Sequence, residues 1–294
     1  MSKPLVIYHG NCADGFTSAW LANMHYGENN PDLAGHTPNR WVVDHHAGVY
    51  GKPPPDVTGR DVYILDFSYT PEVMQVICDE AKFVTHIDHH ASAIKAMADF
   101  HHKRIRKIYD DQRCGAWLTA KYFWPEREPS RMIELVDDRD RWQFRFPQTR
   151  PFHASLFSRP YQIGEWNRLN AMIPEAIREG EAIDRKHFKD INELLDVCMQ
   201  MEVIDGVTVP VANLPYTMAS DACHLMLERV PEAPFAAAWY MRADEMNVFS
   251  FRSRDGETDV SEIAKKFGGG GHKTAAGCAV FGWPDAPVEV ADNF

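Results

Sequence analysis

Short apolar segments that end in a polar residue, with helical segments between them, constrain the fold of this chain more than any other feature. Pro4–His9 is a short apolar run bounded by a glycine, Val62–Leu65 is a buried strand ending at Asp66, and Phe83–Ile87 is another strand ending at Asp88. Buried strands separated by helical crossovers are typical of a parallel, doubly wound sheet. The first half of the chain is therefore expected to be an α/β domain of this kind.

Apolar positions at helical spacing and loop-forming residues complete this expectation. The further predicted elements are helices over Gly15–Tyr26, Thr70–Ala81, Cys114–Trp124 and Ser130–Asp137, a strand over Trp41–Asp44, and a proline-rich loop over Gly51–Gly59. Ligands of doubly wound sheets bind beyond the carboxyl ends of the strands. His9, Asp66 and the Asp88–His90 group each follow such an end, so we expect them along one rim.

The pattern changes in the second half of the chain. Ile173–Met201 has the pattern of a long helix, and after Asp205 the sequence resembles a smaller α+β unit. Its predicted strands are Val207–Val211, Phe235–Tyr240 and Asn247–Arg252, and its predicted helices are Ser220–Glu228 and Val260–Phe267. We expect a catalytic domain over residues 1–202, with a helical linker at about 173–202, and a smaller domain over 203–294.

Composition narrows the classes of protein to consider. The chain has 294 residues, 45% of them hydrophobic, as in folded globular proteins. It has no apolar run of about 18 residues and no signal-peptide pattern. Its six cysteines are widely and irregularly spaced, which favours reduced thiols and a cytoplasmic location. A net charge of −11 argues against long duplex nucleic acid as the main partner.

Residues that follow two of the predicted strands are candidate metal ligands. His9 and Asp14 belong to His9–Gly15, at a strand-to-helix turn, where Asp14 could cap the following helix or bind a metal. Asp66 ends a buried apolar strand and needs a partner, because an isolated buried charge is unfavourable. That partner could be a backbone amide, a lysine or a metal, and one carboxylate can bridge two metals.

Two further motifs combine carboxylates with imidazoles or arginines. His86–His90 places Asp88 and two histidines at a strand end, which favours chemistry over a structural role. Asp137–Trp142 is a charged segment that alone would be interpreted as a solvated loop. Carboxylates and imidazoles without ordered cysteine ligands suit manganese, iron or zinc, and oxygen-rich sites favour manganese or magnesium. Two such ions can activate water for phosphoryl displacement.

A glycine-rich segment in the second domain is a candidate anion site. In Phe267–Gly277 four glycines precede His272, and glycine loops can point backbone amides at an anion. We expect a helix of small residues after His272, whose N-terminal dipole would add to the attraction. A flexible turn is the alternative. Upstream, Ser250–Arg254 carries two arginines that could hold phosphate.

Taken in order, these motifs resemble the DHH phosphoesterase superfamily with its DHH-associated C-terminal domain. The resemblance covers most of the chain: His9–Gly15, Asp66, Asp88–His90, Asp138, then SFRS followed by GGGGHKTAAG. The short-oligonucleotide phosphodiesterases, of oligoribonuclease or nanoRNase type, are the most similar subgroup. The stretch from Tyr50 through the prolines to Asp61–Tyr69 is similar to that subgroup.

The resemblance implies roles for individual residues. The implied metal ligands are His9, Asp14, Asp66, His89 and Asp138, with Asp66 bridging two divalent ions, manganese in preference to magnesium or others. Asp88 would orient His89, so that Asp66, Asp88, His89 and His90 form the catalytic group. The residues implied to contact the substrate phosphate are His90, Arg252, Gly270, Gly271 and His272. Asp138 is chosen over Asp137 because it precedes Trp142 by the four residues seen in the family.

Two features depart from the family pattern. The first motif usually carries two aspartates, two residues apart, but the earlier position is Cys12 here, with Asn11 beside it. This puts the strength of one metal site in question. In addition, Asp44–His46 repeats the letters of the family signature, but it lies before the second motif, so we interpret it as a chance repeat.

The expected function is metal-dependent hydrolysis of short single-stranded oligonucleotides or linear dinucleotides to mononucleotides. The alternatives are hydrolysis of a nucleoside bisphosphate, a cyclic dinucleotide or polyphosphate, and a nucleotide-binding protein without hydrolysis. Cys12 is the sequence feature that favours the last of these. No membrane partner is expected, and a homodimer is compatible with the resemblance.

Overall fold

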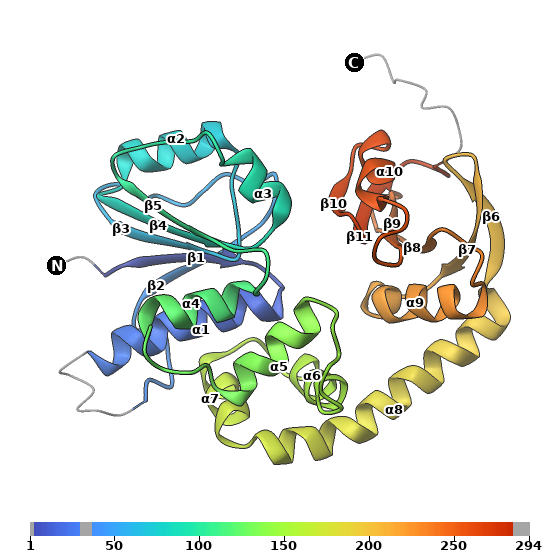
Figure 1. Cartoon of the computed structure of the whole chain (residues 1–294), viewed down its shortest axis with the longest axis horizontal. Coiled ribbons are helices and arrows are strands. Elements are labelled where there is room, and N and C mark those ends of the chain that lie inside the picture. Colours follow the sequence, from blue (N-terminus) through green and yellow to red (C-terminus); the bar gives the residue numbers. More distant parts are fainter. Residues whose placement is uncertain (1–2, 30–36, 285–294) are drawn as a thin grey trace. The chain divides into compact units, whose positions relative to one another are not determined.

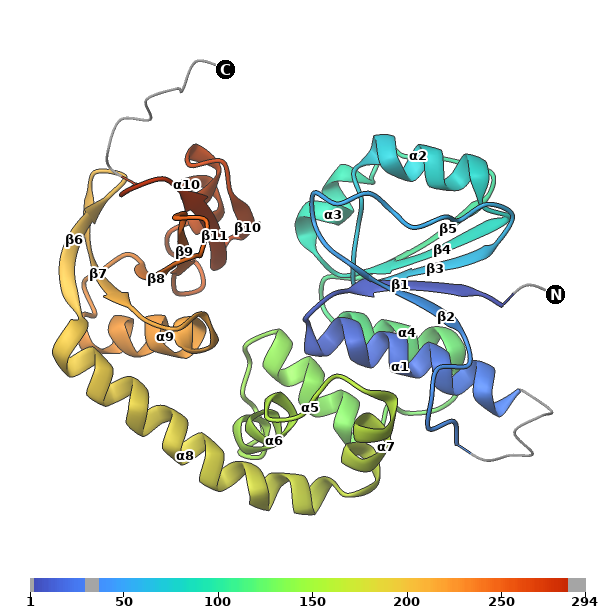
Figure 2. The same cartoon turned by 180° about the vertical axis from the view of Figure 1, so that it is seen from behind.

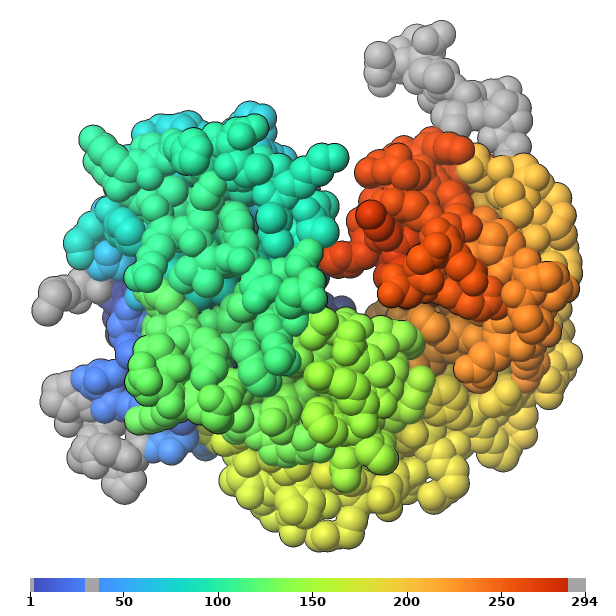
Figure 3. Space-filling view, viewed as in Figure 1, coloured from blue at the N-terminus to red at the C-terminus, as the bar shows by residue number. Residues whose placement is uncertain are grey.

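A computed structural model describes residues 3–29 and 37–284. The chain divides into two compact units, Met1–Asp184 and Arg185–Phe294 (Figure 1). The division falls inside helix α8 (Ile173–Cys198), earlier than the boundary expected near residue 203. The reason is that Ile191 and Leu195, in the second half of α8, are buried in a core of the second unit. Figure 3 shows the surface of the described residues from the same side.

The first unit contains a five-stranded parallel sheet with the strand order β2-β1-β3-β4-β5, as the sequence predicts for a doubly wound domain. Its strands are β1 (Leu5–His9), β2 (Asp44–Gly48), β3 (Asp61–Leu65), β4 (Phe83–Asp88) and β5 (Ile105–Tyr109). Because all five run in the same direction, their carboxyl ends form one edge. This edge is where the predicted site residues are expected.

Helices cover both faces of this sheet (Figures 1 and 2). On one face lie α2 (Pro71–Glu80) and α3 (Ala91–Ala96), and on the other α1 (Ala13–Glu28) and α4 (Gly115–Phe123). Strand β1 alternates accordingly, with Ile7 in the core under α2 and Val6 in the core under α1. The α1 side is extended by α5 (Arg131–Asp140), α6 (Thr149–Phe157) and α7 (Ile163–Ala171).

The edge strands of this sheet differ from the sequence prediction. The second strand is Asp44–Gly48, whereas Trp41–Asp44 was predicted, and β5 was not predicted. Polar, largely exposed residues form β2, so it has no apolar run to mark it.

The repeat Asp44–His46 belongs to β2. Asp44 pairs in register with Leu5, the first residue of β1, and contacts Arg60, so it lies at the end of the sheet opposite His9.

The second unit contains a mixed six-stranded sheet of order β10-β11-β9-β8-β7-β6, in which only the β7–β8 pair is parallel among the described strands. Its strands are β6 (Gln200–Ile204), β7 (Val207–Asn213), β8 (Ala236–Met241), β9 (Asn247–Arg252), β10 (Gly270–His272) and β11 (Ala275–Val280). Its helices are α9 (Ala219–Arg229), α10 (Val260–Lys266) and a short 3₁₀ turn, Tyr216–Met218.

The helix predicted after the glycine run is wrong, because Ala275–Val280 forms strand β11. This segment pairs antiparallel with β9, and a Cβ at Gly277 would lie 2.6 Å from the backbone oxygen of Phe249. Small residues here permit a close approach of two backbones, a role that composition alone does not distinguish from a helix. No helix dipole therefore follows His272, because the segment after it is a strand.

No helix in the described ranges combines the length and apolarity that crossing a membrane requires.

Candidate metal centre

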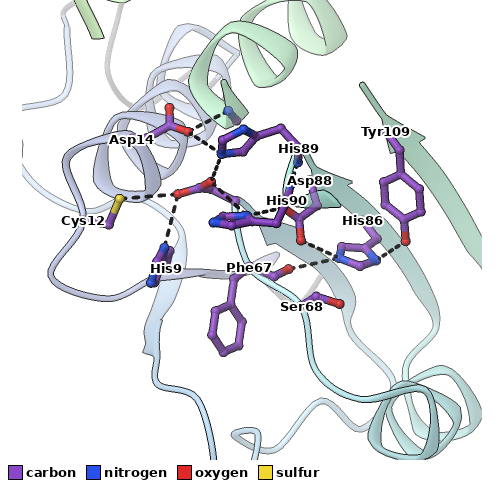
Figure 4. Close-up of polar contacts among 12 residues, drawn as sticks. His9, Cys12, Asp14, Phe67, Ser68, His86, Asp88, His89, His90 and Tyr109 are labelled. Carbon is purple, nitrogen blue, oxygen red and sulfur yellow. Dashed lines mark hydrogen bonds and ion pairs between the residues drawn. The ribbon is translucent and has the colours of Figure 1, made fainter. Parts of the chain in front are cut away.

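Side chains from three strand ends meet at the carboxyl edge of the first sheet (Figure 4). His9 is the last residue of β1, Asp66 follows β3, and Asp88 is the last residue of β4. His89 and His90 come directly after Asp88 and precede α3. The strand order β1-β3-β4 places these ends side by side, as expected for parallel neighbours.

The carboxylate of Asp66 lies at the middle of this group and is 1% exposed. Its Oδ2 is 3.6 Å from His9 Nδ1 and 3.6 Å from Cys12 Sγ. Its Oδ1 is 3.1 Å from His89 Nε2 and 3.7 Å from His90 Nδ1. Asp66 has φ 55°, a left-handed conformation that is uncommon outside glycine, so the turn after β3 is strained in a way often found at functional sites.

Three groups of donor atoms lie at this centre. They are His9, Cys12 and Asp66; Asp66, His89 and His90; and Asp14, His89 and Asp140, and within each group the ligand atoms lie within 4.8 Å of one another. Asp66 belongs to the first two groups, and its 3.1 Å approach to His89 Nε2 links it to the third. A carboxylate between two groups of ligands is the arrangement that a bridging ligand of two metal ions requires.

Asp14 also caps a helix, though not its own. Its Oδ2 accepts a hydrogen bond from Gly115 N at 2.6 Å, and its Oδ1 accepts one from Ala116 N at 2.7 Å, at the N-terminus of α4. The same Oδ2 lies 3.6 Å from His89 Nε2. Asp14 therefore caps a helix and also lies among the candidate metal ligands, whereas sequence analysis treated these two roles as alternatives.

Asp88 fixes the two histidines that follow it. Its Oδ1 accepts hydrogen bonds from the amides of His89 and His90, at 2.7 and 3.1 Å, and lies 2.6 Å from His90 Nδ1. The carboxylate thus holds the ring of His90 and the main chain of His89. The orienting role expected toward His89 acts through the backbone, and His90 is the histidine whose ring Asp88 orients.

His86 is buried beneath this centre and received no role from sequence reasoning. Its Nε2 lies 3.0 Å from the carbonyl oxygen of Phe67, the residue after Asp66, and its Nδ1 lies 2.6 Å from Tyr109 Oη (Figure 4). The ring is fully buried. It therefore ties the strained turn after β3 to β4 and β5.

The electrostatics of the centre favour a cation. Burial and the nearby carboxylates of Asp66 and Asp140 raise the pKa of Asp14 well above its usual value. Burial opposes a charge on His89, but Asp66, Asp140 and Asp14 outweigh it and raise the pKa of His89 to about 10. Several carboxylates thus lie closer together than they would without a positive charge between them.

Unsatisfied atoms support the same conclusion. Among the described residues, His9 Nδ1 and Asp66 Oδ1 are buried atoms without a hydrogen-bond partner. His9 Nδ1 approaches Asp66 Oδ2, and Asp66 Oδ1 approaches His89 Nε2, but neither contact has hydrogen-bond geometry. Buried polar atoms are normally satisfied. Imidazole and carboxylate donors that converge without hydrogen bonding fit divalent metal ions.

Asp138 lies outside this group, contrary to the implied ligand set. Its Oδ1 accepts hydrogen bonds from Arg145 N and Nε, both at 3.0 Å, and its Oδ2 accepts them from Phe146 N and Thr149 Oγ1. Asp140 instead approaches His89 Nε2 at 3.5 Å. Helix α5 continues to Asp140, past the predicted end at Asp137, and this added turn decides which aspartate faces the centre.

In the second unit, Arg252 and His272 lie in one row across the sheet. His272 on β10 pairs with Ala275 on β11, and Ala275 pairs with Arg252 on β9. Residues directly opposite in antiparallel strands point to the same face, and the small Ala275 leaves room between the two longer side chains. Arg252 Nη2 donates to Ser220 Oγ at 2.6 Å.

A pocket of about 520 Å³ includes part of this row. Arg252, Ala275 and Gly270 line it, together with Gly277 and Ser250. Gly271 and His272 continue β10 beyond its lining. The structure therefore places Arg252 and Gly270 at one pocket of the second unit, and His272 at the end of the same row.

Comparison with known proteins agrees with this fold. No family model matches the sequence. The uncharacterized protein R106 of Acanthamoeba polyphaga mimivirus is 25% identical over 304 residues, which span 98% of this chain and 70% of that protein.

Among solved structures, the DHH domain of a protein from a family of ribosomal proteins has a TM-score of 0.56 at 14% identity, over 95% of this chain and 83% of that one. An exopolyphosphatase-related protein from Bacteroides fragilis has a TM-score of 0.53 at 14% identity, over 96% and 88%. At this identity the likeness shows the fold: this chain has the fold of the DHH-domain proteins.

The different surroundings of Asp138 and Asp140 generate a prediction. Asp140→Asn should weaken metal binding and leave the thermal midpoint of the metal-free protein nearly unchanged, because its side chain is 24% exposed and faces the centre. Asp138→Asn should destabilise the protein by about 3 kcal/mol, since charged hydrogen bonds of a buried carboxylate are lost. Metal titration and denaturant unfolding of both variants measure this, and the reverse pattern would make Asp138 the ligand.

Gly115 generates a second prediction. A Cβ here would lie 2.7 Å from Asp66 Cβ and 3.0 Å from Asp14 Oδ2. Gly115→Ala should therefore displace both carboxylates and reduce turnover roughly a hundredfold, as expected for a displacement near 1 Å. Gly164→Ala is the matched control, because its Cβ would meet only the movable side chain of Asn39 at 2.9 Å. Equal activity of the two variants would contradict the prediction.

Proposed function

We propose that this protein is a metal-dependent phosphodiesterase that hydrolyses short oligonucleotides or linear dinucleotides to mononucleotides. The observation that carries the proposal is the meeting of donor groups at the buried carboxylate of Asp66, which belongs to the group of His9 and Cys12 and lies 3.1 Å from His89 of the group that includes Asp14 and Asp140. The DHH-type fold, with this centre at the carboxyl edge of its parallel sheet, supports the same activity.

The proposed ligands follow from the donor sets. One ion would be held by His9, Asp66 and Cys12, and the other by Asp14, His89 and Asp140, with Asp66 shared between the two through its 3.1 Å approach to His89. The second set is richer in carboxylate oxygen, which favours manganese or magnesium, and the imidazoles favour manganese of these two. When bound, such a pair supplies activated water and positive charge at the attacked phosphate.

The chain's own residues would orient the substrate. Asp88 holds the ring of His90 through Nδ1 at 2.6 Å, so that the opposite edge of the imidazole can be directed at a phosphate oxygen. Burial acts against a charge on His90, but its hydrogen bond to Asp88 and the charge of Asp66 raise the pKa of His90 above its usual value. A cationic His90 would donate a charge-assisted hydrogen bond to the phosphate.

The second unit offers a further set of groups that would bind phosphate. Arg252, Gly270, Gly271 and His272 supply a guanidinium, backbone amides and an imidazole along one row of the sheet. Guanidinium groups bind phosphate with paired hydrogen bonds. With a net charge of −11, the protein would bind a few phosphates at such local groups better than a long polyanion. All six cysteines are free thiols, which fits a cytoplasmic enzyme.

The proposal is tested with a substrate panel and one variant. The purified protein with manganese is offered RNA and DNA oligomers of graded length, cyclic dinucleotides, a nucleoside bisphosphate and polyphosphate. We expect hydrolysis to be fastest for the shortest linear oligomers and to stop on chelation. Asp66→Asn should lower kcat at least about a hundredfold, because both ions lose their shared ligand.

Asp56→Asn is a suitable control, since Asp56 lies in a loop and its carboxylate contacts the amide of Thr58. Turnover in Asp66→Asn near that of Asp56→Asn would refute the metal mechanism. Faster cleavage of long strands would instead indicate a processive nuclease, and cleavage of polyphosphate alone would indicate the alternative substrate class.

Cys12 generates a separate prediction about metal preference. Its Sγ lies 3.6 Å from Asp66 Oδ2, and burial together with Asp66, Asp140 and Asp14 raises the pKa of the thiol well above its usual value. A neutral thiol is a weak ligand for hard cations, whereas a carboxylate is a good one. Cys12→Asp should therefore bind manganese and magnesium more tightly.

Calorimetric titration of both proteins with manganese, magnesium and zinc measures this effect. Cys78→Ala is the control, because Cys78 is buried in the core under α2, away from the centre. Superimposable titrations of wild type and Cys12→Asp would remove Cys12 from the proposed ligand set.

A further inference from the structure

The connection between α5 and α6 contains an unusual pair of aromatic residues. Trp142 has φ 55° and Phe144 has φ 48°, so two bulky side chains only two residues apart both occupy the left-handed region. This conformation is rare for bulky residues and typically costs about 1–3 kcal/mol for each. Something must hold the backbone there.

Asp138 holds it. The carbonyl oxygen of Asp138 accepts hydrogen bonds from Gln143 N at 2.9 Å and Phe144 N at 3.4 Å. Its carboxylate accepts from Arg145 N at 3.0 Å and from Phe146 N at 3.3 Å. Four consecutive amides therefore converge on one residue, and the buried Asp138 serves to build this connection.

Arginine side chains lie over both rings. The guanidinium of Arg139 is 4.2 Å from the centre of the Trp142 ring, and that of Arg150 is 4.1 Å from the centre of the Phe144 ring. The two rings meet edge to face at 4.9 Å. The result is a compact set of two aromatic and two guanidinium planes, which we term the aromatic clamp: Arg139, Trp142, Phe144 and Arg150.

The clamp is not part of the hydrophobic core. All three aromatic residues of this connection are half-buried, but Phe146 packs against the hydrophobic core of the first unit, whereas Trp142 and Phe144 are not among the residues of that core. Asp140, a proposed metal ligand, lies between Arg139 and Trp142 in the chain. The clamp and a proposed metal ligand therefore belong to the same short, tightly hydrogen-bonded segment of the chain.

We propose that the aromatic clamp is a subsite that stacks a nucleobase of the substrate. Aromatic faces and guanidinium planes bind bases of single-stranded nucleic acids with little sequence preference. The inference rests on the proposed function and adds a base-recognising element to it. A clamp beside Asp140 would hold the nucleotide that adjoins the phosphate being cleaved, and it would favour nucleotides over polyphosphate.

A purely structural role of the clamp would explain the arginine contacts but not the strained backbone of Trp142 and Phe144. Arg131 lies 4.0 Å over Phe146 and stabilises the same connection with ordinary backbone geometry and a ring against the core. Trp142 and Phe144 differ from Phe146 in their strained backbone conformations and in lying outside the core. Such strain is expected where side chains must be presented to a ligand in a fixed orientation.

The test combines removal of the ring with removal of the base. Wild type, Trp142→Leu and Trp142→Phe are assayed with manganese on a dinucleotide and on two analogues that lack one base or the other. Loss of a stacked base typically lowers kcat/KM about tenfold or more. We expect Trp142→Leu to show this loss on the intact dinucleotide and none on one abasic analogue, with Trp142→Phe restoring most of the activity.

Phe146→Leu is the matched control, since it removes an arginine-covered ring of the same connection. It should lower thermal stability and affect all three substrates alike. If Trp142→Leu also loses activity equally on the intact and abasic substrates, the clamp is structural and the inference is wrong.

A binding measurement separates this inference from the proposed function. Calorimetry with the manganese-loaded full chain compares adenosine monophosphate with ribose 5-phosphate. Tighter binding of the former, lost in Trp142→Leu, would support the clamp even if no dinucleotide were cleaved, in which case only the proposed reaction fails. Equal affinities in wild type would overturn the clamp even if dinucleotides were cleaved.

Discussion

The buried carboxylate of Asp66 is the feature on which the functional interpretation depends. It lies at the end of β3 in a left-handed conformation, between His9 and Cys12 on one side and His89 on the other. An ionised carboxylate at 1% exposure needs positive charge nearby. The partners available are imidazoles rather than lysine or arginine, which distinguishes this centre from a structural ion pair. The parallel sheet supplies its position, and His86 ties the turn through the carbonyl of Phe67.

The fold could be predicted to the extent that strands were buried on both faces. Val62–Leu65 is a continuous apolar run, and Phe83–Ile87 is apolar apart from Thr85 and His86; the structure has strands at both. Asp44–Gly48 and Ile105–Tyr109 are edge strands with polar residues, so their apolar signal was lost. Ala275–Val280 was interpreted as a helix because alanine favours helices. Its conformation is set instead by the close approach of β9, which is a tertiary contact.

The sequence predicted that some of the residues at the candidate centre would share one edge of the sheet. His9, Asp66 and His89 follow predicted strand ends, and ligands of such sheets bind at the carboxyl edge, whereas their roles as metal ligands were implied by the family resemblance and stay a prediction. Asp140 and Gly115 do not follow strand ends, because they come from helices whose ends and approach are set by packing. The spacing of Asp137 and Asp140, about one helical turn apart, is a clue that the sequence contains. In the structure, Asp137 Oδ1 accepts a hydrogen bond from the amide of Cys114 at 2.9 Å. An aspartate one turn later could therefore reach the same region.

An acidic protein can still bind an anionic substrate when its positive groups are concentrated where they act. The net charge of −11 is distributed over the whole chain, whereas Arg139 and Arg150 lie within the segment around Asp140 and Arg252 lies at a pocket of the second unit. The carboxylates of the centre would be neutralised by the ions they hold, which reverses the local field. Long-range repulsion and short-range attraction would then act together to favour a substrate with few phosphates. The proposed aromatic clamp would add affinity for a base, which does not depend on the net charge of the protein.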